Sequence, residues 1–171
     1  MNRTTTMKAA AIAVLTTAIV PLGMTSPAQA STTKDGCTVT PLAPYFAGTY
    51  TAGNVPEVIY PYEVTCSASS AAMSVETKTE TWEADLVGRA GDVDADGVNN
   101  ADEDYIGTAT TTRSFTKAGG TRTVNVKGVL PHTDTDANEE VYHKVKFRVT
   151  SGAVTGSWTA FELTPSTQIW W

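Results

Sequence analysis

The chain has 171 residues and a formal net charge of −6, and 41% of its residues are hydrophobic. This length suits one domain with a single core. The acidic balance argues against nucleic acid as a partner, and against anionic membranes unless calcium bridges the two surfaces.

Residues 1–30 are typical of a bacterial secretory signal peptide. Arg3 and Lys8 supply its positive region, and the apolar stretch that follows is too short to span a membrane. The triplet ending at Ala30 has the small-x-small form of a cleavage site. We therefore expect cleavage after Ala30 and a secreted, unanchored product of residues 31–171. Loss of the two basic residues changes its formal charge from −6 to −8.

The only two cysteines are Cys37 and Cys66. In an exported chain such a pair predicts a structural disulfide. Closing a loop of about thirty residues contributes roughly 3–4 kcal/mol in the chain-entropy model. Zinc requires more ligands than two distant cysteines supply, and a catalytic pair is more often C-x-x-C.

Short runs rich in threonine and valine, separated by glycine or proline, indicate strands. Pro61 lies inside the first run and suggests that it is an edge strand, whereas residues 31–35 read as a loose lead-in. No segment carries a helical period over three turns. The predicted strands are residues 58–66, 73–83, 105–115, 121–129, 141–149 and 154–163.

The clearest alternation lies in residues 141–149. Four apolar residues are expected to face inward, and the cations Lys144, Lys146 and Arg148 to face outward. The inward set is Val141, Val145, Phe147 and Val149. Together the strands predict an all-β domain, an antiparallel β-sandwich of immunoglobulin-like or related topology, over residues 31–171.

An acidic loop at residues 88–104 connects two of these strands. Its carboxylates recur at Asp92, Asp94 and Asp96, with Gly97 permitting the sharp turn that follows. The run from Asp92 to Asp104 holds six acids and no base, so each close pair repels by roughly 1 kcal/mol at 4 Å in water. A divalent cation turns this repulsion into attraction, and such oxygen-rich spacing suits Ca²⁺.

This D-x-D-x-D-G run resembles the calcium loops of EF-hands, and still more those of dockerins and thrombospondin-type calcium repeats. The whole chain is not identified with a family, because the resemblance covers roughly fifteen residues. It departs from EF-hands at Asn99 and in its non-helical flanks, and Asp102 or Asp104 can replace the closing acid. The resemblance implies ligation by the side chains of Asp92, Asp94 and Asp96, the carbonyl of Val98, Asn100 (directly or through water) and Glu103.

A second oxygen-rich segment contains Asp134, Asp136, Asn138 and Glu140, but it lacks the glycine. It is either a weak second cation site or a solvated hairpin tip. The two histidines, His132 and His143, flank it, which allows a zinc site to be imagined. His143 falls on the inward face of its strand, so a core role is the favoured interpretation.

Five aromatic residues offer a possible sugar-binding platform, against the alternative of core packing with a C-terminal plug at residues 169–171. They are Trp158, Trp170, Trp171, Tyr45 and Tyr50. The sequence carries no G-x-S-x-G, H-E-x-x-H or phosphate-loop motif, and we expect no enzyme.

The sequence therefore predicts a secreted calcium-binding β-sandwich domain, in which Ca²⁺ is structural or regulatory for an extracellular interaction surface. The alternative is an extracellular module that binds glycan, cell wall or protein, with calcium incidental. A weaker alternative is a secreted inhibitor or toxin-like protein.

Overall fold

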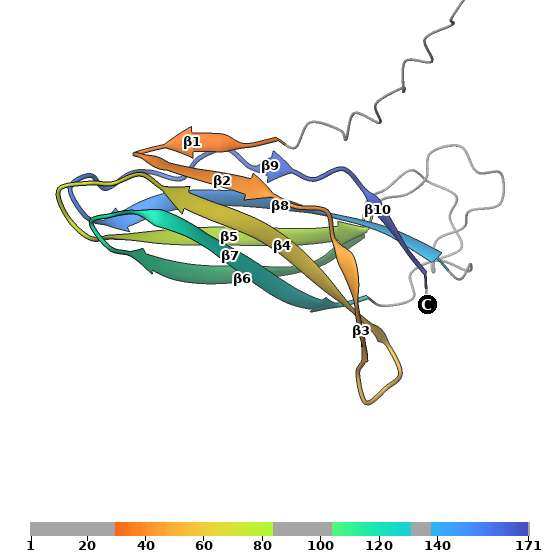
Figure 1. Ribbon diagram of the computed structural model, residues 1–171. Coiled ribbons are helices and arrows are strands. Elements are labelled where there is room, and N and C mark those ends of the chain that lie inside the picture. Colours follow the sequence, from red (N-terminus) through yellow and green to blue (C-terminus); the bar gives the residue numbers. More distant parts are fainter. Residues whose placement is uncertain (1–29, 84–103, 131–137, 171) are drawn as a thin grey trace, which may run out of the picture.

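The computed structural model describes residues 30–83, 104–130 and 138–170. Within these ranges the chain forms strands and turns, without a helix, in two antiparallel sheets (Figure 1). The predicted all-β class is confirmed. Over the same residues there is accordingly no helix with the length and apolar character needed to span a membrane.

The first sheet is built around β4. Strands β2 and β3 pair in succession with one edge of β4, β7 pairs with the other edge, and β1 pairs with β2. These strands are β1 (Thr32–Lys34), β2 (Cys37–Pro41), β3 (Tyr45–Tyr50), β4 (Pro56–Cys66) and β7 (Gly120–Val129).

The second sheet is built around the pair of β5 and β8. Strand β6 pairs with the free edge of β5, and β9 and β10 pair with the free edge of β8. Its strands are β5 (Met73–Glu83), β6 (Asp104–Phe115), β8 (Asn138–Ser151), β9 (Glu162–Leu163) and β10 (Thr167–Trp170).

Side-chain alternation decides which face of the second sheet is buried. Along β5, every second residue from Met73 to Glu83 is buried, and Glu76, Lys78 and Glu80 lie between them on the outer face. Strand β8 repeats this period as predicted, with Phe147 inside and its three cations outside. Since successive strand residues point to opposite faces, the sequence pattern fixes which face meets the core.

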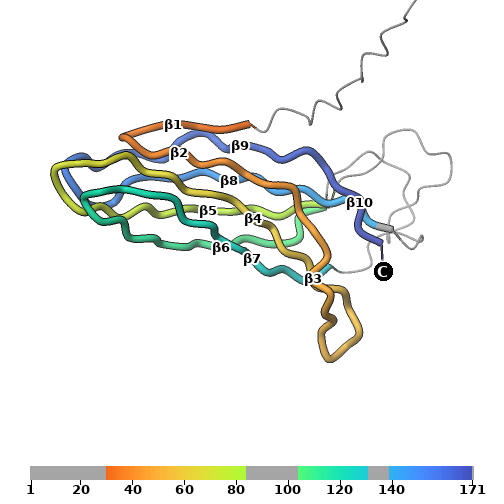
Figure 2. The backbone as a smooth tube through the Cα atoms, viewed as in Figure 1, coloured from red at the N-terminus to blue at the C-terminus, as the bar shows by residue number. Residues whose placement is uncertain are grey.

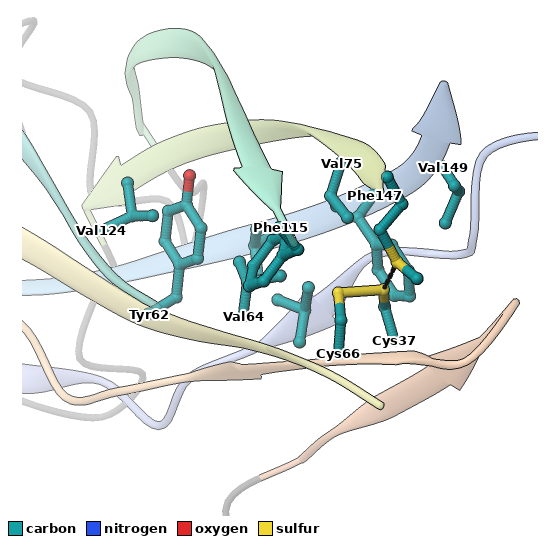
Figure 3. Close-up of a cluster of buried hydrophobic side chains, with 12 residues drawn as sticks. Cys37, Tyr62, Val64, Cys66, Val75, Phe115, Val124, Phe147 and Val149 are labelled. Atoms are coloured by element: carbon teal, nitrogen blue, oxygen red, sulfur yellow. Dashed lines mark hydrogen bonds between the residues drawn. A yellow bond between two sulfur atoms is a disulfide. The ribbon is translucent and has the colours of Figure 1, made fainter. Parts of the chain in front are cut away.

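The larger core cluster lies between the sheets and contains the disulfide (Figure 3). Valines and aromatic rings from both sheets point toward one another there, including Tyr62 and Phe147. The Tyr62 hydroxyl lies 2.6 Å from Thr77 Oγ1, so a hydrogen bond crosses between the layers. The predicted bond between Cys37 and Cys66 is confirmed; these residues are direct register partners in β2 and β4, so it links two strands of one sheet.

The expectation that Pro61 marks an edge strand is wrong, because β4 is paired on both sides. Pro61 lies where β2, which reaches Tyr62, gives way to β3, which begins opposite Ile59. The Pro61 carbonyl accepts a bond from Leu42 N on that side. In an antiparallel ladder the backbone N and O of one residue face the same neighbouring strand. The N–H that Pro61 lacks would therefore point to the junction between β2 and β3, where neither strand needs it as a donor.

The expectation of a loose lead-in at residues 31–35 is also wrong, because residues 32–34 form β1. Asp35 and Gly36 have φ values of 52° and 77°, which is the conformation of a two-residue type I′ turn. Lys34 Nζ bonds the Ser157 carbonyl at 2.9 Å, and the Thr32 hydroxyl donates to Glu162. Contacts with the C-terminal segment, which no local pattern reveals, therefore hold β1 in place.

The predicted strand at residues 154–163 is largely wrong, since only Glu162 and Leu163 form a strand. Figure 2 shows the backbone path that leads from β8 to β9. Before them the chain follows β8 through isolated bonds, from Gly156 N to Val149 O and from Thr159 N to Phe147 O. This irregular path places Trp158 and Phe161 beside the outward cations of β8.

Candidate functional site

The predicted calcium ligands lie outside the described residues, but both ends of their loop are described. Glu83 ends β5 and Asp104 begins β6, and these two residues are register partners. Residues 84–103 therefore leave and rejoin the fold at adjacent positions. Asp104, the alternative closing ligand, is itself exposed. The candidate calcium ligands that lie outside the described ranges are Asp92, Asp94, Asp96, Val98, Asn100, Asp102 and Glu103.

The second oxygen-rich segment attaches at the same end of the molecule. Glu83 is the register partner of Val141 as well as of Asp104, and Asn138 opens the strand that holds Val141. Asp134, Asp136 and His132 lie outside the described residues, so the second cation site and the His132 ligand stay untested. Among residues 30–83, 104–130 and 138–170, no three His, Cys, Asp or Glu side chains gather as a metal site.

A buried polar cluster lies beneath this end. His143 is fully buried, as the sequence indicated, and its ring contacts Tyr60 edge-to-face at 5.8 Å. Burial lowers the pKa of His143 to about 4, against a smaller opposing effect of the Pro61 carbonyl, so the imidazole is neutral at pH 7. Burial and, secondarily, the Glu83 charge raise the pKa of Tyr60. This neutral His143 fits a core role better than a surface ligand.

The outer face of the second sheet carries a row of cations against aromatic rings. Lys144 Nζ lies 4.3 Å from the Trp82 ring centroid, and Arg148 Cζ lies 4.7 Å from that of Trp158. Lys146 Nζ lies 4.4 Å from the Phe161 ring centroid. These distances suit cation–π attraction. We call this surface the cation–aromatic face; it comprises Trp82, Tyr105, Lys144, Lys146, Arg148, Trp158 and Phe161.

The face owes its order to strand register. Trp82 on β5 is opposite Tyr105 on β6, and the two rings meet edge-to-face at 5.2 Å. On the β8 side, Glu76 is opposite Arg148 and accepts its guanidinium N–H groups at 2.6 Å. Tertiary register thus assembles side chains that lie 23 residues apart in the sequence for Trp82 and Tyr105, and 72 residues apart for Glu76 and Arg148.

The five aromatic residues that the sequence singled out come from separate parts of the fold. Only Trp158 belongs to the cation–aromatic face. Tyr45 and Tyr50 lie on β3 of the other sheet, and Trp170 lies on β10. Ile169 is buried as the proposed plug requires, but Trp170 is 63% exposed. Trp171 lies outside the described residues.

Sequence reasoning missed Trp82 and Tyr105. Trp82 has the same parity in β5 as Glu76, Lys78 and Glu80, so strand alternation predicts that it faces outward. That signal places the indole on the solvent side but leaves open which neighbours surround it.

Comparison with known proteins identifies no family. No family model matches the chain, and no curated protein matches it. A solved structure titled "X-ray structure of Northeast Structural Genomics Consortium target SoR45" is similar at 8% identity and a TM-score of 0.36. The match covers 80% of this chain and 88% of the chain in that structure. A likeness at this TM-score supports no conclusion about this chain.

Proposed function

We propose that the protein is an extracellular calcium-binding domain, in which the ion is structural or regulatory for an interaction surface. Oxygen ligands at alternate positions, followed by a glycine, suit a hard cation that takes six to eight ligands. The proposed ligands are Asp92, Asp94, Asp96, the carbonyl of Val98, Asn100 and Glu103.

The observation that best supports this proposal is the pairing of Glu83 with Asp104. The β5–β6 ladder holds the two ends of the acidic segment together, so the fold has already met most of the entropic cost of closing this loop. Trp82 and Tyr105 pack against each other at the same point. The closing Glu103 directly precedes Asp104, and Asp104 has a fixed position in the sheet.

Calcium is expected to raise the thermal midpoint of the purified protein. Extracellular sites commonly bind at about 10⁻⁴–10⁻³ M. An ion that binds only the native state then adds roughly 1–2 kcal/mol at ten times Kd. Differential scanning calorimetry in 10 mM EDTA and in ~10 mM CaCl₂ measures this difference.

The paired variants Asp92→Ala/Asp96→Ala and Asp134→Ala/Asp136→Ala locate the effect. Each removes two acidic charges from a segment at the same end of the molecule. The first variant should lose the response to calcium, and the second should keep it. A melt that ignores calcium in the unmutated protein, or a response lost only in the second variant, would contradict the proposal.

We also infer an immunoglobulin-like sandwich as the finer description of the fold. Strands β2, β4 and β7 share one sheet, and β5, β8 and β10 share the other, with β6 added beside β5. This division matches strands A, B and E against C, F and G of such domains. The disulfide differs from that of antibody domains, because it joins β2 to β4 within one sheet.

A second candidate function is an extracellular binding module that recognises a glycan. The cation–aromatic face supports it, because rings beside cations provide stacking surfaces and polar contacts together. Retention of the protein on immobilised polysaccharides tests this function, and it does not depend on calcium binding.

A further inference from the structure

The cation–aromatic face concentrates positive charge on an acidic protein. The chain carries a formal charge of −6. On the outer face, Lys144, Lys146 and Arg148 occupy alternate positions of β8. Lys78 of β5 is the direct register partner of Lys146, so two ammonium-bearing residues oppose each other across the ladder. Like charges directly opposite destabilise a sheet, and an anionic partner relieves that cost.

Acidic neighbours balance this charge unevenly along the face. Arg148 pairs with Glu76, and Lys78 Nζ lies 2.8 Å from Glu80, which is also the register partner of Lys144. The Glu80 hydrogen bond raises the pKa of Lys78, so this ammonium stays charged over the neutral range. Lys146 instead lies over the rings of Phe161 and Trp158, at 4.4 and 5.4 Å. Its charge faces aromatic surface and solvent in the middle of the row.

The aromatic residues add a stacking surface beside the charges. Tyr105 is 53% exposed and contacts Trp82, whose ring lies beneath Lys144 Nζ. A planar ring next to an ammonium group suits a sugar that bears an anionic substituent. The sugar ring lies against the aromatic side chain, while its charge meets the cation.

The length of the row indicates a chain rather than a single sugar. Lys144 and Arg148 are separated by four residues of β8, which corresponds to about 13 Å at roughly 3.3 Å per residue. Each end of this distance has its own ring, Trp82 at one and Trp158 at the other. A ligand that uses both ends must extend along the strand.

We infer that the cation–aromatic face binds an acidic polysaccharide, with carboxylate or sulfate groups meeting Lys144, Lys146 and Arg148 and a sugar ring lying against the exposed ring of Tyr105. This inference rests on the second proposed function and gives it a ligand class. Polygalacturonate, which carries carboxylates only, and chondroitin sulfate, which also carries sulfates, distinguish the two sources of negative charge.

The test is affinity electrophoresis of the full chain in 5 mM EDTA, which prevents calcium from bridging protein and ligand. The gels contain polygalacturonate, chondroitin sulfate, neutral dextran or poly-L-glutamate. We expect retardation by at least one acidic polysaccharide, weaker retardation by poly-L-glutamate and none by dextran. Retardation should fall as salt rises, because the pairing is electrostatic.

The informative variant is Lys144→Gln/Lys146→Gln, and the matched control is Lys117→Gln/Arg122→Gln. The control removes the same charge from exposed positions on the turn before β7 and on β7 itself, in the other sheet. We expect roughly a tenfold loss of affinity for the first variant and less than a twofold change for the control. Tyr105→Ala alters an exposed ring, so it reports on stacking even if the double variant fails to fold.

The outcomes separate this inference from the function on which it rests. Equal retardation by dextran keeps a glycan-binding module and overturns the acidic ligand. Equal or stronger retardation by poly-L-glutamate, or an equal loss in the control variant, overturns a sugar-specific site. Absence of retardation in every polysaccharide overturns both the inference and the glycan-binding function, and leaves the calcium proposal intact.

Discussion

Gly48 and Gly119 share one backbone conformation in different surroundings. Both have φ values of +72°, in the region that favours glycine. A Cβ atom at Gly48 would meet nothing within 4 Å, whereas one at Gly119 would lie 2.2 Å from the Cys66 carbonyl oxygen. The pair therefore separates the cost of the backbone conformation from the cost of a steric clash.

Replacing Gly48 by alanine should cost about 1–2 kcal/mol, the penalty of a left-handed conformation. Replacing Gly119 should cost a further ~1–3 kcal/mol, because the backbone at Cys66 and Ser67 must move. Urea unfolding of both variants in EDTA measures the two costs. Equal destabilisation would show that the β6–β7 turn accommodates the new atom.

At the scale of elements, the disulfide joins two directly paired strands. Cys37 and Cys66 are register partners and are almost completely buried. The bond therefore adds a covalent link where β2 and β4 already pair, and its contribution comes mainly from restricting the unfolded chain over a separation of 29 residues.

Reduction is expected to lower the free energy of unfolding by roughly 3–4 kcal/mol. Urea denaturation with and without a phosphine reductant measures this change while the core volume stays nearly constant. The Cys37→Ala/Cys66→Ala variant serves as the control and should ignore the reductant. An unchanged midpoint in the unmutated protein would indicate that β-sheet pairing alone restrains β2.

The sequence predicted the long strands well, because alternation and burial agree in them. Residues 73–83 match β5, and the inward and outward sets of β8 were assigned correctly. Strands β1, β2, β3 and β10 escaped prediction. They are short, and β1 depends on bonds from Lys34 and Thr32 to residues more than 120 positions away. A local pattern carries no information about such partners.

The candidate sites divide in the same way. The calcium motif is contiguous, so the sequence alone could propose it, and it stays a prediction. The cation–aromatic face joins β5, β6, β8 and the irregular segment before β9. Its outward cations were foreseen, but Trp82 and Tyr105 became recognisable only through the register between strands.

At the scale of the whole molecule, buried His143 couples stability to pH. Its pKa is about 4 in the folded protein and about 6.5 in an unfolded chain. Between these values the unfolded state binds a proton that the folded state excludes. Stability therefore falls as the pH drops from 6.5 to 4, by about 3 kcal/mol in total, and is unaffected by this group above pH 6.5.

The variant His143→Leu should flatten that dependence while keeping a side chain of similar size against Tyr60. Free energies of unfolding between pH 4.5 and 7.5, measured in EDTA, give one curve for each protein. Subtracting the curves cancels the carboxylates that both share. Parallel curves would mean that the imidazole takes up its proton without leaving the core.

Strand β4 also constrains how the chain reaches its native state. Its ten-residue ladder with β7 runs from Glu57 opposite Val129 to Cys66 opposite Gly120. Strands β5 and β6 of the second sheet lie between β4 and β7 in the sequence, so the first sheet cannot be completed by neighbouring strands alone. Assembly requires closing loops of more than fifty residues before that ladder forms, which places the domain among slow folders of high contact order. Until then, the backbone N–H and C=O groups along the edge of β4 that pairs with β7 have no strand partner.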